Sequence, residues 1–377
     1  MKKKIIIIGG GKIGSTIFNF LSLFDTLDLT LADSNKTTLA THNKAPSHPH
    51  RRTLLLSDPC DFDNLFQQND YLAVINAGPF FLSITLAQAA FNQGLSYFDL
   101  TEDVESCEFI QTLARSSKSQ HVFVPQCGLA PGFISILARH LYGQFERIES
   151  VQLRVGALPQ FPTNQMLYNL TWSTAGLVNE YCNMCLGIEQ GELVHQAPLE
   201  NKEMFSLEGV DYEAFNTSGG LGTLTQTLAG KVEQLNYKTV RYPGHRDFMT
   251  FLLRDLKFQE KDKRASLVQL LDENIPMTSQ DRVLIIVTVC GDIKQPTNGM
   301  SRYQQLTELR HVHSQTIELP GQAAQNYSAI QICTAASLCA VVELWLKNQL
   351  PNTGFVRQES ISLALFYQTH FGQYLLP

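Results

Sequence analysis

The sequence has no excess of basic residues over acidic ones. Its 377 residues include 29 Lys and Arg against 35 Asp and Glu, which gives a formal net charge of -6. A protein that binds nucleic acid through phosphates needs an excess of basic residues, so nucleic acid is not expected as a partner. Charged residues make up 17% of the chain and hydrophobic residues 44%. This composition excludes a disordered chain, and the length favours a globular protein of two domains.

Long hydrophobic runs are also missing. The longest apolar stretch, Ala329 to Leu346, is interrupted by Gln331, Thr334, Ser337 and Glu343. A membrane helix needs about 18 or more consecutive residues that are predominantly apolar. No segment is therefore expected to cross a membrane.

The amino terminus does not have the pattern of a secretory leader. Three lysines precede Ile5 to Ile8, but this apolar run then meets three glycines, and no small-residue cleavage site follows. We interpret the segment as a first strand. The sequence predicts a cytoplasmic protein with no membrane partner.

The cysteines form no disulfide or metal framework. Cys182 and Cys185 make a C-x-x-C pair in the helical stretch Leu177 to Leu186, but no second pair completes four ligands. Reduced thiols fit a chain without a leader, and we expect no metal site. The eight cysteines are Cys60, Cys107, Cys127, Cys182, Cys185, Cys290, Cys333 and Cys339.

Up to about residue 145, short apolar runs of β type alternate with helical stretches. This pattern is typical of a parallel sheet wrapped by helices. The predicted strands are Lys4 to Ile8, Asp28 to Ala32, Arg52 to Leu56, Leu72 to Asn76, Ser96 to Leu100 and Val122 to Pro125. The predicted helices are Ser15 to Phe24, Phe62 to Gln68, Leu82 to Asn92 and Glu105 to Arg115. The fold class predicted is α/β, a Rossmann doubly wound sheet with its ligand crevice at the carboxyl ends of the strands.

After Glu149 the pattern changes. The predicted strands are Val151 to Val155, Met166 to Trp172 and Arg282 to Val289, with hairpin-like turns at Gln190-Gly191-Glu192 and Ser218-Gly219-Gly220. A second, α+β domain is therefore expected. The helix Ala329 to Leu346 is apolar on several sides and must be buried, and we place it on the first sheet. The predicted domains are 1–130, completed by 325–377, and 131–324.

A dinucleotide fingerprint lies at the first strand end. Gly9-Gly10-Gly11-Lys12-Ile13-Gly14 matches G-x-G-x-x-G, follows an apolar strand and opens a helix. Gly9 permits the tight turn, Gly11 lets the backbone approach the pyrophosphate, and Gly14 lets helix and strand pack. Asp33, 19 residues after Gly14, ends the next strand and would accept hydrogen bonds from ribose hydroxyls. The sequence thus predicts a dinucleotide-binding domain.

Asp33 also indicates which dinucleotide binds. A carboxylate at this place repels the 2'-phosphate of NADP, while Ser34 and Asn35 are neutral and only Lys36 could offset the repulsion. NAD is therefore predicted over NADP.

Further strand ends are predicted to contact the cofactor. Asp58 follows the third strand, and Asn76-Ala77-Gly78-Pro79 follows the fourth, although a Gly-Pro turn is also an ordinary loop. The whole predicted cofactor-binding set is Gly9, Gly11, Lys12, Ile13, Gly14, Asp33, Ser34, Asp58, Asn76, Ala77, Gly78, Pro79, Thr101, Ala130 and Pro131.

Several segments, taken in order along the chain, resemble the saccharopine dehydrogenase family, and within it most closely lysine 6-dehydrogenases. They are Tyr97-Phe98-Asp99-Leu100-Thr101-Glu102, Cys127-Gly128-Leu129-Ala130-Pro131-Gly132, Gly156-Ala157-Leu158-Pro159 with Tyr168 and Trp172-Ser173, Glu213-Ala214-Phe215 with Ser218-Gly219-Gly220, and Arg241-Tyr242-Pro243-Gly244-His245. Two features also fit the saccharopine reductases: Cys127 before the Gly-x-Ala-Pro-Gly loop, and the tail from Arg357 to Gly372.

The resemblance implies an NAD(P)-dependent oxidoreductase that acts on a carbon bearing nitrogen. Its substrate would be lysine or a lysine-derived amino acid, and the protein would belong to lysine metabolism. The resemblance also implies a cytoplasmic homodimer whose second domain carries the substrate site and much of the subunit contact. A saccharopine reductase or carboxyalkyl-amine dehydrogenase, and a non-catalytic NAD-binding regulator, remain open as alternatives.

The candidate substrate and catalytic residues each have an alternative reading. Arg241 could bind a substrate carboxylate with its planar fork, or lie on a solvated surface. His245 could accept a proton, or be held by a local hydrogen bond. Asp99 and Glu102 follow the fifth strand and could act as acid or base, although Glu102 could instead complement the start of a helix.

Two further residues are predicted to line the substrate site. Cys127 is small enough to let the loop after it close over the nicotinamide, and hydride transfer needs no thiolate nucleophile. Trp172 could be a wall of the substrate pocket or part of the core.

Overall fold

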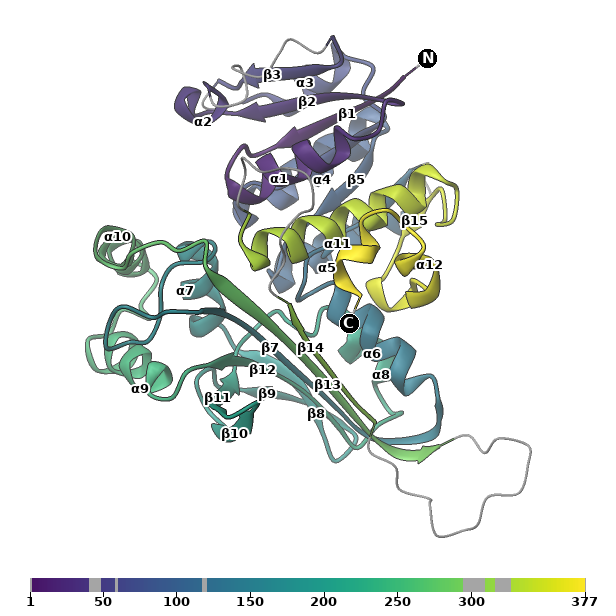
Figure 1. Cartoon of the computed structure of the whole chain (residues 1–377). Helices are drawn as coiled ribbons and strands as arrows, with labels where there is room; N and C mark the ends of the chain where they lie inside the picture. Colours follow the sequence, from purple (N-terminus) through teal and green to yellow (C-terminus); the bar gives the residue numbers. More distant parts are fainter. Residues whose placement is uncertain are drawn as a thin grey trace. The chain divides into compact units, whose positions relative to one another are not determined.

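The computed structural model describes residues 2–40, 49–57, 60–116, 121–293, 309–315 and 327–376, with the backbone alone described for 309–315. The chain forms two compact units (Figure 1). The first unit is Met1–Phe133 with Gln331–Leu376, and the second is Ile134–Ile330. The first unit is therefore made of two separate stretches of chain. The functional roles predicted for the two parts stay predictions.

The first unit contains a seven-stranded parallel sheet of the order β15-β6-β5-β4-β1-β2-β3. Its strands are β1 (Lys3–Ile8), β2 (Leu27–Asp33), β3 (Arg51–Leu55), β4 (Ala73–Asn76), β5 (Ser96–Asp99), β6 (Val122–Val124) and β15 (Gly354–Phe355). The six strands predicted in this part are confirmed to within a residue or two at each end. The two-residue β15 was not predicted, because such a short segment has no periodicity to read. The order β3-β2-β1-β4-β5-β6 is that of a Rossmann fold.

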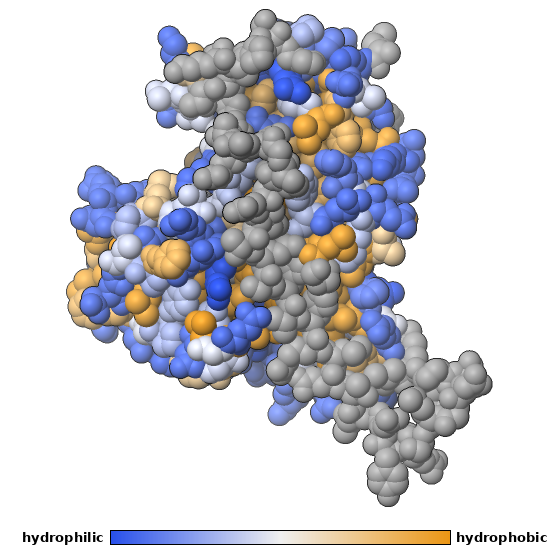
Figure 2. All heavy atoms as spheres, in the orientation of Figure 1, coloured by the Kyte–Doolittle hydropathy of each residue, from blue (hydrophilic) through white to orange (hydrophobic). Residues whose placement is uncertain are grey.

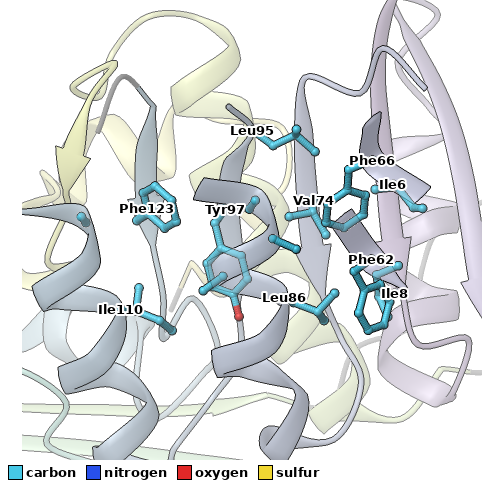
Figure 3. Packing of buried hydrophobic residues seen from close by; sticks show 14 of the residues in the cluster. Ile6, Ile8, Phe62, Phe66, Val74, Leu86, Leu95, Tyr97, Ile110 and Phe123 are labelled. Atoms are coloured by element: carbon cyan, nitrogen blue, oxygen red, sulfur yellow. The ribbon is translucent and has the colours of Figure 1, made fainter. Parts of the chain in front are cut away.

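Helices cover both faces of this sheet. They are α1 (Lys12–Leu21), α2 (Lys36–Ala40), α3 (Phe62–Gln67), α4 (Ser83–Gln93), α5 (Val104–Ala114), α11 (Ala329–Leu346) and α12 (Leu363–Tyr367), with 3-10 turns η1 (Phe80–Leu82), η4 (Gln358–Ser360) and η5 (Gly372–Leu375). Figure 3 shows one core, in which side chains of α3, α4 and α5 pack against Ile6, Ile8 and Val74 of the sheet. Successive strand residues point to opposite faces, so Ile5 and Ile7 of the same strand are buried on the other side.

The other face of the sheet receives α11. Trp345 of this helix lies against Phe98 of β5, with ring centroids 5.2 Å apart. By length and composition α11 could cross a membrane, but 83% of the relevant window is buried inside the protein. The predicted bounds of this helix and its burial on the first sheet are confirmed. Its apolar faces are thus explained by packing within the fold.

The second unit contains an eight-stranded mixed sheet. The main order is β10-β11-β12-β7-β13-β14, with β8 paired to β12 and β9 paired to β8. Its strands are β7 (Phe145–Pro159), β8 (Cys185–Glu189), β9 (Glu192–Gln196), β10 (Glu203–Leu207), β11 (Val210–Asn216), β12 (Gln234–Arg241), β13 (Asp281–Ile293) and β14 (Leu309–Gln315). All of its described pairings are antiparallel except β12 with β7. The expected α+β architecture is confirmed.

The helices of the second unit are α6 (Phe133–Tyr142), which begins at the unit boundary, α7 (Thr174–Cys182), α8 (Leu224–Leu228), α9 (His245–Thr250), the π-helical turn η2 (Phe251–Asp255) and α10 (Arg264–Asn274). Helices α7, α9 and α10 and the turn η2 build a core with Phe215 of the sheet, and none of the described residues of this core comes from α6 or α8. Leu177 and Tyr181 of α7, Met249 of α9 and Leu267 of α10 pack together with Phe215 of β11. This core surrounds the residues considered below.

Two predicted elements of this unit are wrong. Residues 166–172 were predicted as a strand, but they form an irregular segment with a single bridge at Leu170. The reason is a turn in which the Leu167 N–H bonds the Asn164 carbonyl and Leu167 takes a left-handed conformation at φ 50.

The predicted hairpin at Gln190-Gly191-Glu192 is confirmed, because it joins β8 to β9.

The second predicted hairpin turn, Ser218-Gly219-Gly220, does not join two strands. It leads from β11 towards α8. A Cβ added at Gly220 would lie 2.4 Å from the ring of Tyr237. The glycine there is explained by close packing rather than by a hairpin.

Large apolar side chains that remain exposed are scattered over both units. Examples are Phe81 in the first unit, and Phe161, Phe251 and Met277 in the second. On the face shown in Figure 2, hydrophobic atoms lie in separate patches among hydrophilic ones. Scattered apolar residues of this kind are normal on protein surfaces, and we infer no partner from them.

Candidate active site

In the glycine-rich loop, Gly9 and Gly14 pack closely against backbone atoms, and Gly11 faces open space. A Cβ at Gly9, where φ is 100, would lie 2.6 Å from the Gly78 nitrogen, and one at Gly14 would lie 1.8 Å from the Gly9 oxygen. Larger residues are therefore excluded at both places. A Cβ at Gly11 would meet nothing within 4 Å. The loop thus leaves open space at the glycine that was predicted to face the pyrophosphate.

The helix that follows the loop has an uncapped start. Gly11 is the N-cap of α1, no side chain caps it, and the first turn has no acidic residue. Backbone N–H groups at the start of a helix and the positive end of the helix dipole favour an anion there. Lys12 is exposed and Ile13 is partly buried at this end of the helix. These features fit a dinucleotide pyrophosphate.

Asp33 joins the end of β2 to the glycine-rich loop. Its Oδ2 accepts a hydrogen bond from the Gly10 N–H at 2.6 Å, and its Oδ1 accepts one from the Asn35 N–H at 2.7 Å. Each oxygen has a second lone pair available for a ribose hydroxyl. Ser34 is exposed beside it. Asp58, also predicted to contact the cofactor, lies outside the described residues.

The turn after β4 supports the loop from the side. The Asn76 Oδ1 accepts the Gly78 N–H at 3.0 Å, and the Asn76 Nδ2 donates to the Ser83 Oγ at 3.1 Å. Asn76 is 2% exposed, so its side chain holds the turn rather than facing a ligand. Ala77 and Gly78 bring their backbone against Gly9.

Two predicted cofactor contacts occupy different surroundings at the neighbouring strand ends. Pro79, at the end of the β4 turn, is exposed. Thr101, after β5, is buried and accepts the Asp103 N–H with its Oγ1. Pro79 is therefore accessible to a ligand, whereas the side chain of Thr101 is used in a hydrogen bond within its own turn.

Asp99 was predicted to be catalytic, but it is fully buried at the end of β5. Its Oδ1 accepts the N–H groups of Thr101 and Gln126, and its Oδ2 lies 2.9 Å from the Tyr97 hydroxyl. Burial raises the pKa of Asp99 to about 6, although the hydrogen bonds from Gln126, Thr101 and Tyr97 oppose the shift. With 0% of the side chain exposed, this arrangement supports a structural role instead.

Glu102 lies in a different environment three residues later. Burial raises its pKa to about 7, and the carboxylates of Asp103 and Asp99 raise it further. The sequence left open whether Glu102 complements the next helix. In the structure Asp103 is the N-cap of α5 and accepts the Ser106 N–H, so the capping role belongs to Asp103. The residue Glu102 is half-buried, and a pKa of about 7 lets its carboxyl gain or lose a proton near neutral pH.

Cys127 was predicted to line the substrate site, but its thiol faces backbone. Its Sγ lies 3.0 Å from the Val124 carbonyl oxygen and receives the Gln358 amide at 3.3 Å, and the residue is 0% exposed. Burial raises the pKa of this thiol well above its usual range. A buried thiol bonded to the end of β6 positions the loop and does not contact a substrate directly.

The loop that follows Cys127 is tightly folded. The Phe133 N–H bonds the Gly128 carbonyl, and a Cβ at Gly132 would lie 1.9 Å from the same oxygen. Ala130 is partly exposed and Pro131 is buried. Of the predicted cofactor contacts in this loop, Ala130 is therefore the accessible one.

In the second unit, Arg241 ends β12 inside the core. It is 3% exposed, and its Nη1 donates to the Val240 carbonyl at 2.9 Å and to the Ala157 carbonyl at 3.4 Å. The guanidinium carbon lies 5.2 Å from the centroid of the Tyr168 ring. The Arg241 Nε is buried without a hydrogen-bond partner. The alternative of a solvated surface arginine is therefore wrong.

The charge of Arg241 is maintained by its neighbours. Burial lowers the pKa of its guanidinium. Tyr181, Tyr168 and Glu180 outweigh this effect, so the pKa lies above its usual value. Glu180, on α7, is 6% exposed. A buried carboxylate beside a buried guanidinium offsets part of the cost of removing both from water.

His245 was predicted to accept a proton, but the structure supports the alternative reading. Its Nδ1 lies 3.3 Å from the Met166 carbonyl oxygen and its Nε2 lies 3.2 Å from the Tyr181 hydroxyl. Burial, and then the charge of Arg241, lower the pKa of His245 to about 3. A carbonyl only accepts, so Nδ1 carries the proton and the Tyr181 hydroxyl donates to Nε2. His245 is neutral at ordinary pH and holds Tyr181 in place.

Trp172 is half-buried and packs against the core formed by α7, α9 and α10. It therefore belongs partly to the core, as the alternative reading had it. Glu180 and Tyr181 were missed, because a carboxylate and a phenol in a helical stretch resemble an ordinary amphipathic helix. Only the tertiary fold brings them beside Arg241.

Among residues 2–40, 49–57, 60–116, 121–293 and 327–376, no group of three or more His, Cys, Asp or Glu side chains could hold a metal ion. All eight cysteines are free thiols.

Comparison with known proteins identifies two family domains. The saccharopine dehydrogenase NADP binding domain matches residues 5–122, and the saccharopine dehydrogenase C-terminal domain matches residues 128–371. Among solved structures, the apo saccharopine dehydrogenase (L-Glu forming) from Saccharomyces cerevisiae is 13% identical at a TM-score of 0.71 and covers 97% of this chain and 95% of its own. This similarity shows a shared fold.

Two other solved structures match over similar lengths at lower scores. An engineered D-amino acid dehydrogenase bound to NADP+ is 11% identical at a TM-score of 0.49 and covers 98% of this chain and 97% of its own. The dipicolinate-bound dihydrodipicolinate reductase from Paenisporosarcina sp. TG-14 is 13% identical at a TM-score of 0.43, with 96% and 100% covered.

Proposed function

Because this chain belongs to the saccharopine dehydrogenase family, an oxidoreductase family with a nicotinamide dinucleotide cofactor, we propose that it oxidises a CH–NH group of lysine or of a lysine-derived amino acid, with NAD as cofactor. The observation that carries the proposal is the dinucleotide cradle of the first unit. There, an open Gly11, an uncapped helix start and Asp33 lie at adjacent strand ends.

The residues of the cradle fit the cofactor. The N–H groups at the start of α1 would hold the pyrophosphate, and the free lone pairs of Asp33 would hold the adenosine ribose hydroxyls. When bound, the nicotinamide ring supplies a hydride acceptor. Asp33 is fixed by two backbone N–H groups and cannot easily turn away from a 2'-phosphate. This supports NAD over NADP, although the matching family domain is named for NADP.

Glu102 is the group we propose as acid and base. An amine can lose a hydride only when its nitrogen is neutral, so a base must first remove a proton from the ammonium form. A carboxyl with a pKa of about 7 can accept that proton at neutral pH. The same carboxyl can return the proton when the reaction runs in the other direction.

Arg241 is the group we propose for the amino-acid carboxylate. Its guanidinium keeps its charge in a buried place, and its Nε has an unused N–H. A planar guanidinium binds a carboxylate through two parallel N–H groups. The hydrogen bond to the neutral His245 fixes the Tyr181 hydroxyl, and Tyr181 is a polar neighbour of this guanidinium. In this proposal Glu102 moves the proton and Arg241 binds the carboxylate of the substrate.

The proposal is tested by following the absorbance of the reduced cofactor. The folded protein is incubated with NAD or NADP and with lysine or saccharopine. We expect turnover with one amino acid, and faster turnover with NAD. No turnover in any of the four combinations would overturn the catalytic proposal. If calorimetry then showed that NAD binds, a non-catalytic NAD-binding regulator would be the better assignment.

The choice of substrate needs a separate comparison. Faster turnover with saccharopine than with lysine would identify a saccharopine reductase or a related carboxyalkyl-amine dehydrogenase instead. We further propose a cytoplasmic homodimer, on the strength of the resemblance. Sedimentation of the purified chain as a single species of the monomer mass of 42.3 kDa would contradict the dimer.

A further inference from the structure

A pair of buried cations lies on the sheet of the second unit, apart from the residues of the candidate active site. Arg154 of β7 and Lys238 of β12 are in register with each other, and residues in register on neighbouring strands point to the same face of a sheet. Arg154 is 6% exposed and Lys238 is 8% exposed. Arg241 comes three residues after Lys238 on the same strand, so it points to the opposite face. The cationic pair is therefore separate from Arg241.

The two cations share one carboxylate. Glu203 of β10 accepts hydrogen bonds from the Nε and the Nη2 of Arg154, and its Oε2 lies 3.1 Å from Nη2. The same Oε2 accepts a hydrogen bond from the Lys238 Nζ at 2.8 Å. Glu203 is in register with Ala214 on the intervening strand β11, where a small side chain leaves room for the carboxylate to reach across. The Glu203 side chain is 37% exposed, so it covers the pair from the solvent side.

The N–H groups of the two cations can be counted. Arg154 donates its Nε–H and one N–H of Nη2 to Glu203, and Nη1 donates to the Leu153 carbonyl at 2.8 Å and to the Asn236 Oδ1 at 2.7 Å. A guanidinium has five N–H groups, so one N–H of Nη2 remains. The Lys238 ammonium uses one of its three N–H groups, and two remain. These remaining groups have no acceptor in the described part of the chain.

The charges of the cluster do not balance. Two cations face one carboxylate, and no other carboxylate among the described residues forms an ion pair with either of them. Burial lowers the pKa of Lys238, Glu203 opposes this shift, and the charge of Arg154 adds to it. A buried charge without a counter-ion is costly. An anion with a single negative charge would balance the cluster.

We propose that Arg154 and Lys238 form a binding site for the carboxylate of a small organic acid, with Glu203 as the third member of the cluster. The charge of one carboxylate balances the excess. Its two oxygens can accept the remaining N–H groups of the Lys238 Nζ and the Arg154 Nη2. The site goes beyond the proposed function, because it lies on the other face of the sheet from Arg241 and requires no turnover.

The test follows the Nε–H group of Arg154 by NMR in protein labelled with isotope-enriched arginine. Its signal is the one that is missing from Arg154→Lys. Acetate is added in exchange for chloride at constant ionic strength, and we expect a saturable shift of this signal. If the shift does not saturate, the proposal is overturned. If inorganic phosphate gives a saturable shift and acetate does not, the assignment to a carboxylate is wrong.

Two variants should change the affinity for acetate in opposite directions. Lys238→Met removes two of the remaining N–H groups and leaves Arg154 paired with Glu203, so the dissociation constant should rise about ten-fold or more. Glu203→Gln removes the competing carboxylate, so the dissociation constant should fall about two-fold or more. Lys261→Met, at an exposed position, is the matched control and should behave as the parent.

Either variant can contradict the proposal by itself. It is overturned if Lys238→Met binds acetate as tightly as the parent, and also if Glu203→Gln binds it more weakly. Thermal unfolding shows whether each variant is folded. If Lys238→Met does not fold, the direction of the change in Glu203→Gln decides.

Arg241→Ala separates this site from the proposed substrate site. Acetate also carries the group that Arg241 is proposed to bind, but the Arg154 signal should still shift in Arg241→Ala, because the two side chains lie on opposite faces of the sheet. If the shift is lost in Arg241→Ala and kept in Lys238→Met, acetate acts through Arg241 and the inference is wrong. Absence of turnover with every amino acid would overturn the proposed function and leave this test unaffected.

Discussion

Glu213 lies opposite Arg241 in the β11–β12 pair, and both of its carboxylate oxygens hold the turn that follows Arg241. Oε2 accepts the Gly244 N–H at 3.0 Å and Oε1 accepts the Arg246 N–H at 2.7 Å. Glu213 is 0% exposed. This carboxylate closes the start of α9 and thereby fixes the segment between Arg241 and His245.

Replacing Glu213 should therefore affect the substrate more than the cofactor. Glu213→Ala leaves two partly buried N–H groups without acceptors, at a cost of up to about 1–3 kcal/mol each. We expect a higher KM for the amino acid and an unchanged dissociation constant for NAD. Steady-state kinetics and calorimetry measure the two effects. Glu233→Ala, at an exposed position, is the matched control, and equal losses of cofactor and substrate affinity in Glu213→Ala would contradict the assignment.

Arg241→Ala removes the proposed carboxylate ligand itself. We expect the KM for the amino acid to rise by about ten-fold or more, in line with about 1.5–3 kcal/mol for a charge-assisted hydrogen bond. Affinity for NAD should stay intact. A variant with weakened NAD binding and an unchanged KM would show that Arg241 does not bind the substrate. Because the change removes a buried cation that lies in the field of Glu180, the stability of the variant should be measured alongside.

Glu102→Gln should remove the acid limb of the pH–rate profile. The pKa of Glu102 is raised to about 7 in the folded protein, so amine oxidation should rise with pH as this carboxyl loses its proton. The glutamine cannot accept a proton, and a fall in kcat of about 10²–10⁴ is expected. Glu105→Gln, exposed on the next helix, is the control. An unchanged acid limb in Glu102→Gln would rule out Glu102 as the base.

His245 should give the opposite result. Its pKa is lowered to about 3 by burial and by Arg241, so it stays neutral over the working range. His245→Gln should keep the acid limb near pH 7 and raise the KM for the amino acid, because Tyr181 loses the acceptor that orients it. The profile is recorded over about pH 5–9. Loss of the acid limb in this variant would restore His245 as a proton acceptor.

Asp33→Ser should relax the choice of cofactor. The change removes the negative charge that opposes a 2'-phosphate, and it also removes the acceptors for the Gly10 and Asn35 N–H groups. We expect weaker NAD binding and stronger NADP binding, with the ratio of the two dissociation constants shifting by about ten-fold or more. Calorimetry with both cofactors measures the ratio. If the parent already prefers NADP, the prediction about Asp33 is wrong.

Much of the first unit follows from local rules. Apolar runs bounded by glycine and polar residues predict the strands, and the spacing of Gly9, Gly11 and Gly14 predicts the loop geometry that the structure shows. These features depend on a few neighbouring residues. The predicted strand at 166–172 failed because Asn164 and the left-handed Leu167 form a turn, and apolar composition does not reveal a turn of that kind.

The protonation behaviour of the site residues could not be read in the same way. Asp99 and Glu102 are three residues apart, yet Asp99 is fully buried and Glu102 is half-buried. The pKa of His245 is lowered by burial and then by Arg241, which lies on a different element. Burial and charge neighbours belong to the tertiary fold, so sequence patterns can nominate such residues but not assign their roles.

The cofactor unit is built from both ends of the chain, since Gln331–Leu376 packs with Met1–Phe133. During synthesis, the strands around Phe98 leave the ribosome long before Trp345 exists to cover them. The first unit can therefore complete its core only after the second has been made. Until then its open sheet face is a surface on which chaperones can act, and a ribosome that stalls before Gln331 leaves an apolar sheet without its cover.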